Sequence, residues 1–91
     1  MFRALSGEKL EQIGAISHYY SKIGVSVIDL TAKITVGDTI RIKGMTTDFT
    51  QKIDSMQIEH ANIQTASAGQ SIGLKVNDRV RVGDIVYQVL A

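Results

Sequence analysis

Short segments in which apolar and polar residues alternate recur along this chain at intervals of about ten residues. In "TIRIKG", residues 39–44, Ile40 and Ile42 share one face, while Arg41 and Lys43 share the other. This period of two is the pattern of a strand that buries one side. Because helical periodicity is nearly absent after the first dozen residues, the chain is predicted to be all-β.

Six segments have this strand-like character. They are residues 13–20, 24–30, 39–44, 48–60, 70–76 and 85–91. The fourth segment is too long for a flat strand and its apolar residues change face, so we expect a bulge or sharp bend near Asp54 and Ser55. Closing the sheet would remove exposed edges in so short a chain. We therefore expect a small closed six-stranded antiparallel barrel over residues 13–91, preceded at residues 1–12 by a tail or short helix.

The composition narrows the class of protein. A length of 91 residues fits one domain, and 44% hydrophobic with 21% charged residues is typical of a globular chain. Cysteine is absent, which excludes disulfides and thiolate metal sites and favours the reducing cytoplasm. The sequence contains neither a secretory leader pattern nor an apolar run of about 20 residues, so no membrane association is expected. Ten basic and nine acidic residues give a net charge of +1, which neither requires nor forbids a nucleic-acid partner.

The phrase Val-Gly-Asp occurs twice, in "KITVGD" at residues 33–38 and in "RVRVGD" at residues 79–84. Glycine tolerates a positive φ at a tight reversal, and the aspartate can accept backbone N–H bonds just after the turn. We expect two equivalent turns that lead into strands, each anchored against the core by its valine, Val36 or Val82. An anion-binding loop is the alternative, but a single glycine, a neighbouring carboxylate and no following helix argue against it. The expected turn residues are Gly37, Asp38, Gly69, Gly83 and Asp84.

Three stretches carry a family resemblance: "VGDTIRI", "DSMQIEHANIQTASAGQSIGLKV" and "VRVGDIV". Together they resemble the second domain of translational GTPases, the β-barrel that follows the G domain in elongation factor Tu, initiation factor 2 and the selenocysteine-specific factor. The family's A-x-A-G-x-x-V/I-G-L segment is matched by Ala66, Ala68, Gly69, Ile72, Gly73 and Leu74. The resemblance spans about residues 13–90 and implies contact with tRNA or rRNA.

A second resemblance is closer in sequence. "SHYYSKIGVSVIDL" and "VGDTIRIKGMTTDFTQKIDSMQIEH" are similar to the C-terminal barrel of collagenase-like peptidases, several of which are regarded as RNA-hydroxylation proteins. Free-standing elongation-factor-like small proteins share this wording. The 91 residues contain no G-x-x-x-x-G-K-[ST] loop and no peptidase-like catalytic domain, so neither GTPase nor peptidase chemistry is expected in them.

The titratable side chains do not suggest catalysis. The two histidines, His18 and His60, lie in no recognised catalytic motif. Asp48 and Asp54 are not paired, because residues that favour a turn or bulge separate them. Scattered ligands without close spacing are weak evidence for a metal. We therefore expect no enzyme activity, no metal and no cofactor.

Two polar surfaces are candidates for RNA binding. The aromatic rings and lysine of "SHYYSKIG" suit base stacking with phosphate attraction, and the outward basic face of "TIRIKG" could follow a phosphate backbone. The RNA-binding candidates are His18, Tyr19, Tyr20, Lys22, Arg41 and Lys43. The alternatives are that one tyrosine plugs the barrel end while the other covers the hairpin, and that the basic residues protect a strand edge.

Two functions are therefore open. The first is an RNA-binding accessory module of translation or RNA modification, with tRNA or rRNA as partner, which is what the GTPase resemblance implies. The second is a module that docks on a separately encoded protein or on itself, present as a monomer or weak homodimer.

Overall fold

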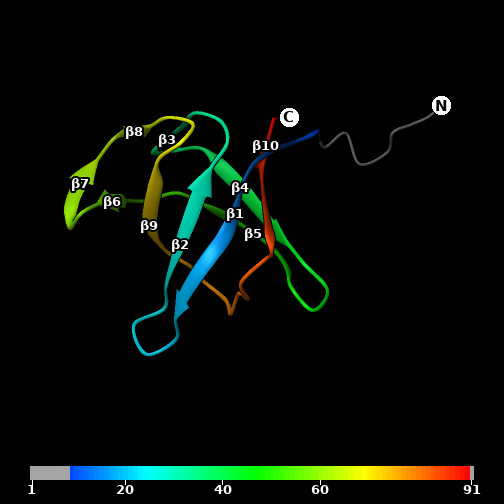
Figure 1. Cartoon of the computed structure of the whole chain (residues 1–91). Helices are drawn as coiled ribbons and strands as arrows, with labels where there is room; N and C mark the ends of the chain where they lie inside the picture. Colours follow the sequence, from blue (N-terminus) through cyan, green and yellow to red (C-terminus); the bar gives the residue numbers. More distant parts are fainter. Residues whose placement is uncertain (1–8, 91) are drawn as a thin grey trace.

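The computed structural model describes residues 9–90, which form ten β-strands and no helix (Figure 1). The strands are β1 (Leu10–Tyr20), β2 (Val25–Leu30), β3 (Ile34–Thr35), β4 (Thr39–Lys43), β5 (Asp48–Lys52), β6 (Met56–Ile58), β7 (Ala61–Ile63), β8 (Thr65–Ala66), β9 (Ser71–Lys75) and β10 (Ile85–Val89). Every strand pairing is antiparallel, so the predicted all-β antiparallel class is confirmed. The expected tail or helix falls mostly on residues 1–8, outside the described residues, and β1 begins before residue 13. Within residues 9–90, no helix has the length and hydropathy needed to cross a bilayer.

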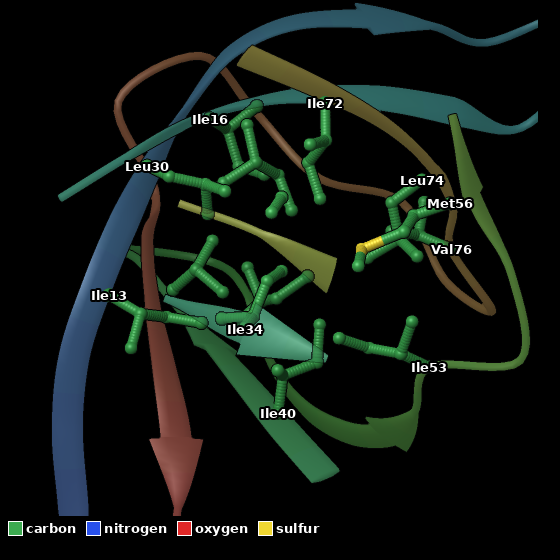
Figure 2. Close-up of a cluster of buried hydrophobic side chains, with 14 of the residues drawn as sticks. Ile13, Ile16, Leu30, Ile34, Ile40, Ile53, Met56, Ile72, Leu74 and Val76 are labelled. Carbon is green, nitrogen blue, oxygen red and sulfur yellow. The ribbon is translucent and has the colours of Figure 1, made fainter. Parts of the chain in front are cut away.

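The strands form one large and one small sheet. The large sheet has eight strands in the order β5-β4-β10-β1-β2-β9-β6-β7, and β3 pairs with β8 in the small one. Buried aliphatic side chains from both sheets converge on one interior cluster (Figure 2). The cluster includes Ile13, Ile28, Ile34, Ile42, Ile53, Met56, Ile72 and Val86, all exposed by 1% or less. The strands therefore surround a single core.

The structure has more strands than the six expected because short connecting segments also pair. The long segment at residues 48–60 does break, since residues 53–55 lie outside any strand and separate β5 from β6. The break brings both apolar sets inward, and Ile53 and Met56 are each 1% exposed. The predicted bend near Asp54 and Ser55 is therefore confirmed. The remaining additional strands, β3, β7 and β8, are two or three residues long.

A buried glutamine joins the outer edge of β5 to the end of β9. The side-chain amide of Gln51, 7% exposed, donates to the carbonyl of Lys75 at 3.0 Å. Its oxygen accepts the backbone N–H of Asn77 at 2.7 Å. On its other side β5 continues its pairing toward β4, where the backbone N–H of Ile53 donates to the carbonyl of Asp38 at 2.9 Å. The curled sheet is thus bridged at this point by a side chain rather than by a strand ladder.

The valine of the Val-Gly-Asp phrase packs on the core in the first copy but not in the second. Val36 is partly buried and packs on the core, but Val82 is 68% exposed. The expectation that Val82 anchors its turn is therefore wrong. Val80, 2% exposed, is buried instead, and the residue at the equivalent place in the first copy, Ile34, is 1% exposed. In both copies, the buried anchor is the residue two positions before the valine of the phrase.

Candidate functional site

Three loops meet at one end of the large sheet, which we call the loop end. They are the β1–β2 turn (residues 21–24), the β4–β5 turn (residues 44–47) and the β9–β10 loop (residues 76–84). Ile85 at the start of β10 pairs with Lys43 in β4, which places the β9–β10 loop beside the β4–β5 turn. The β1–β2 turn reaches the same loop because the backbone N–H of Val76 donates to the carbonyl of Gly24 at 2.9 Å. All three loops lie in the lower half of Figure 1.

The second Val-Gly-Asp turn shapes the β9–β10 loop. Gly83 has φ of 95°, and the Asp84 carboxylate accepts the backbone N–H of Arg81 at 2.9 Å. The backbone of this turn also exchanges two hydrogen bonds of 2.8 Å with Ile16 of β1. The other Asp84 oxygen occupies the place of a Cβ on Gly44, so the loop is held closely against the β4–β5 turn.

The first copy has the same geometry at the opposite end of β4. Gly37 has φ of 100°, and the Asp38 carboxylate accepts the backbone N–H of Thr35 at 2.8 Å. In both turns, the carboxylate therefore bonds to the N–H three residues before it, whereas the sequence suggested an N–H after it. Gly69, with φ of 91°, lies in the turn before β9.

A cleft of about 310 Å³ lies between the β4–β5 turn and the β9–β10 loop. It is lined by Thr46, Thr47, Asp48, Phe49, Asp78, Arg79 and Arg81. Asp48 is already engaged, because Arg41 donates to its two oxygens at 2.8 and 2.9 Å. These hydrogen bonds, with the charges of Arg41 and Lys43, hold the pKa of Asp48 below its usual value.

The predicted RNA-binding residues fall into two groups separated by β10. His18 and Tyr20 lie exposed on β1 with ring centroids 5.3 Å apart, whereas Tyr19 packs against the core. The neighbouring tyrosines therefore do not form one stacking platform. Arg41 and Lys43 are half-buried on β4, and Lys22 is exposed in the β1–β2 turn.

Sequence reasoning missed the apolar character of the loop end. Ile23 is 63% exposed, Met45 100% and Val82 68%, each from a different loop, and Tyr20 at the end of β1 is 49% exposed. Among the described residues, the other large exposed hydrophobic side chain is Leu90. Single apolar residues inside turns give no periodic signal, so only the structure reveals that these side chains are exposed.

The described part of the chain has no metal-ligand cluster: no three His, Cys, Asp or Glu side chains come together in it. His18 lies on β1, where its Nδ1 is 3.0 Å from the carbonyl oxygen of Ser17. His60 lies in the β6–β7 turn with a positive φ of 66°. In the order of the large sheet, β2 and β9 lie between β1, which carries His18, and β6, which precedes His60.

Sequence comparison relates the chain to proteases. It is 40% identical over 77 residues to an "uncharacterized protease" of Methanocaldococcus jannaschii, covering 84% of this chain and 19% of that protein. It is 31% identical over 78 residues to a collagenase of Porphyromonas gingivalis, covering 84% of this chain and 22% of that one. The chain thus spans about a fifth of the length of these curated relatives. No protein-family model matches it.

Solved structures establish the same fold in a peptidase domain. The C-terminal domain of a Geobacillus thermoleovorans "putative U32 peptidase" superposes with a TM-score of 0.81 at 20% identity, covering 86% of this chain and 91% of that one. Its selenomethionine variant gives a TM-score of 0.79. The fold found here is therefore that of the C-terminal domain of this U32-type protein.

These findings correct the functional prediction. The curated relatives are named as a protease and a collagenase, in agreement with the resemblance to the C-terminal barrel of collagenase-like peptidases, and the C-terminal domain of the U32-type protein shares the fold. The resemblance to the second domain of translational GTPases is not supported. The prediction of an RNA-binding module of translation is wrong, because the curated relatives are named as a protease and a collagenase rather than as translation factors.

Proposed function

We propose that this chain is a non-catalytic accessory domain that docks on the catalytic part of a U32-type peptidase. The observation that carries the proposal is the 40% identity to a 77-residue segment that makes up only 19% of a protease. A segment of that size corresponds to one β-domain of the kind seen here, so the remaining four-fifths of that protein has room for the catalytic machinery.

The arrangement of side chains supports a non-catalytic role. Nucleophilic catalysis needs a hydroxyl or thiol hydrogen-bonded to a base that a third group orients. Cysteine is absent from the sequence. Within residues 9–90, neither His18 nor His60 forms a hydrogen bond with a serine or threonine hydroxyl. These contacts support a role in binding rather than in catalysis for residues 9–90.

The exposed loop end supports docking. Exposed apolar side chains gathered from separate loops and bordered by charges mark interaction sites on soluble proteins. Ile23, Met45 and Val82 are exposed, one on each of the three loops at the loop end, and Arg79 and Arg81 are exposed on the β9–β10 loop. A domain that is one part of a larger peptidase would use such a surface to contact the rest.

The proposal can be tested with the Methanocaldococcus protease lacking its matched segment. We expect this chain, added separately, to form a one-to-one complex with the truncated protease in light scattering after gel filtration. The intact protease should bind the chain more weakly, because its own segment fills the place. The chain alone should cleave neither gelatin, which is denatured collagen, nor casein, a general substrate of proteases. Cleavage by the chain alone, or no complex with the truncated protease, would overturn the proposal.

A further inference from the structure

We infer that the cleft at the loop end binds a peptide segment in which a carboxylate lies beside apolar residues. On the proposed function above, on which this assignment of a partner rests, that segment belongs to the catalytic part of the peptidase. The inference depends on the charges in the cleft, on a buried threonine in its wall and on exposed apolar side chains that adjoin its lining residues in the chain.

The cleft presents two arginines whose neighbouring acids are already bonded. Arg79 and Arg81 line it and are exposed, and neither guanidinium has an acceptor among residues 9–90. Of the two acids in the lining, Asp48 holds Arg41, and Asp78 accepts the backbone N–H of Arg79 at 2.8 Å. A guanidinium binds a carboxylate through two parallel hydrogen bonds. The cleft is therefore suited to an incoming carboxylate.

A buried hydroxyl in the cleft wall also lacks a partner. Thr47 is 6% exposed and lines the cleft. Its backbone carbonyl accepts the N–H of Gly44 at 2.7 Å, but its hydroxyl makes no hydrogen bond to another residue in the described part of the chain. A buried hydroxyl without a partner is unfavourable, and a ligand that supplies one gains affinity and specificity. A carboxylate oxygen or a peptide carbonyl can accept this hydrogen bond.

The surroundings favour a peptide over a nucleic acid. Met45 and Val82 do not line the cleft, but each is next in the chain to a residue that does, Thr46 or Arg81, and they are exposed by 100% and 68%. Aliphatic side chains gain free energy against apolar residues of a peptide and nothing from a phosphate backbone, and methionine adapts to varied partners. Asp48 and Asp78 in the same lining repel any anion, and they repel a run of consecutive phosphates more strongly than a single carboxylate. The partner chemistry is therefore a single carboxylate flanked by apolar residues.

The inference can be tested by fluorescence anisotropy with labelled probes. The first probe is a short peptide in which glutamate and leucine alternate, the second is the same peptide with glutamine in place of glutamate, and the third is a single-stranded RNA of similar length. We expect the glutamate peptide to bind and the glutamine peptide to bind about tenfold more weakly. The double variant R79Q/R81Q should lose about tenfold affinity for the glutamate peptide, and Thr47→Val a few-fold.

The doubled phrase supplies the matched control. Lys33 takes the place of Arg79 in the equivalent turn, at the other end of β4, and is exposed as well. Lys33→Gln removes a positive charge in the same local setting and should leave the affinity unchanged. Circular dichroism checks that R79Q/R81Q is folded, which we expect because both arginines are exposed. Equal binding of the two peptides, or equal affinity of R79Q/R81Q and wild type, would overturn the inference. Tighter binding of the RNA than of the peptide would also overturn it.

Binding to the truncated protease separates this inference from the proposed function. If the wild-type chain and R79Q/R81Q bind that protease equally, the chain docks through another surface and the cleft assignment is wrong, while the proposed function stands. If the glutamate peptide binds in an arginine-dependent way but the protease does not, the cleft assignment stands and the proposed function is wrong. Loss of protease binding in R79Q/R81Q, with normal binding of Lys33→Gln, supports both.

Discussion

Gly14 of β1 should not tolerate even a methyl group. It is buried and pairs on one side with Leu30 of β2 and on the other with Val86 of β10. A Cβ at this position would lie 2.6 Å from the carbonyl oxygen of Asp29 and 3.0 Å from Cγ2 of Ile28. The first of these atoms belongs to the backbone, so Gly14→Ala requires β2 to move away from β1.

The magnitude follows from two opposing terms. Overpacking of a close-packed interior costs about 1–3 kcal/mol. Alanine also restricts the unfolded chain more than glycine does, which returns about 0.4–1 kcal/mol. We therefore expect Gly14→Ala to lower the free energy of unfolding by about 1–2 kcal/mol, and the Tm by about 5–15 °C for a domain of this size.

The assay is urea unfolding followed by circular dichroism, with Gly73→Ala as the matched control. Gly73 also lies in a strand, but a Cβ there would meet its nearest atoms at 3.8 and 3.9 Å, which is ordinary contact. Gly73→Ala should therefore be neutral or stabilised by up to about 1 kcal/mol. If Gly14→Ala proves as stable as Gly73→Ala, the close approach of β1 and β2 does not limit this position and the reasoning is refuted.

Three further predictions concern single side chains. Gln51→Met removes both hydrogen bonds that join β5 to the end of β9 and should lower the free energy of unfolding in urea by about 1–3 kcal/mol. The control Gln57→Met loses an exposed hydrogen bond and should change that free energy by about 0.5 kcal/mol or less. Equal effects of the two variants would contradict the bridging role of Gln51. His60→Gly relieves a positive φ of 66° and should raise the free energy of unfolding by about 0.5–1 kcal/mol, and a lower Tm would show that the turn is not strained. Because the folded-state pKa of Asp48 is lowered, its contribution to stability is complete above pH about 4 and is lost as the pH falls through the lower folded value. Arg41→Gln should remove the contribution of Asp48 to the pH dependence of the free energy of unfolding. If the free energy of unfolding of Arg41→Gln varies with pH as that of the wild type does, Arg41 does not lower the pKa of Asp48.

Local pattern was enough to predict the fold class and its main strands. The alternation of Ile40 and Ile42 with Arg41 and Lys43 gives the observed inside and outside of β4. The phase change at residues 53–55 places the bend correctly. These features depend on neighbours within a few residues, so they can be read from the sequence by the period of two and by turn chemistry.

The candidate site depended on tertiary structure. Nothing local distinguishes Val80, which is buried, from Val82, which is exposed, because both stand in the same alternating phrase and the register of the loop decides which one faces the core. The cleft likewise joins the β4–β5 turn to Arg79 and Arg81, more than thirty residues further along the chain. It forms because β10 pairs with both β4 and β1, and that long-range pairing is set by burial of the whole core. The sequence by itself thus determined an all-β chain with two Val-Gly-Asp turns, and only the packed sheet decided which loop residues meet at the cleft.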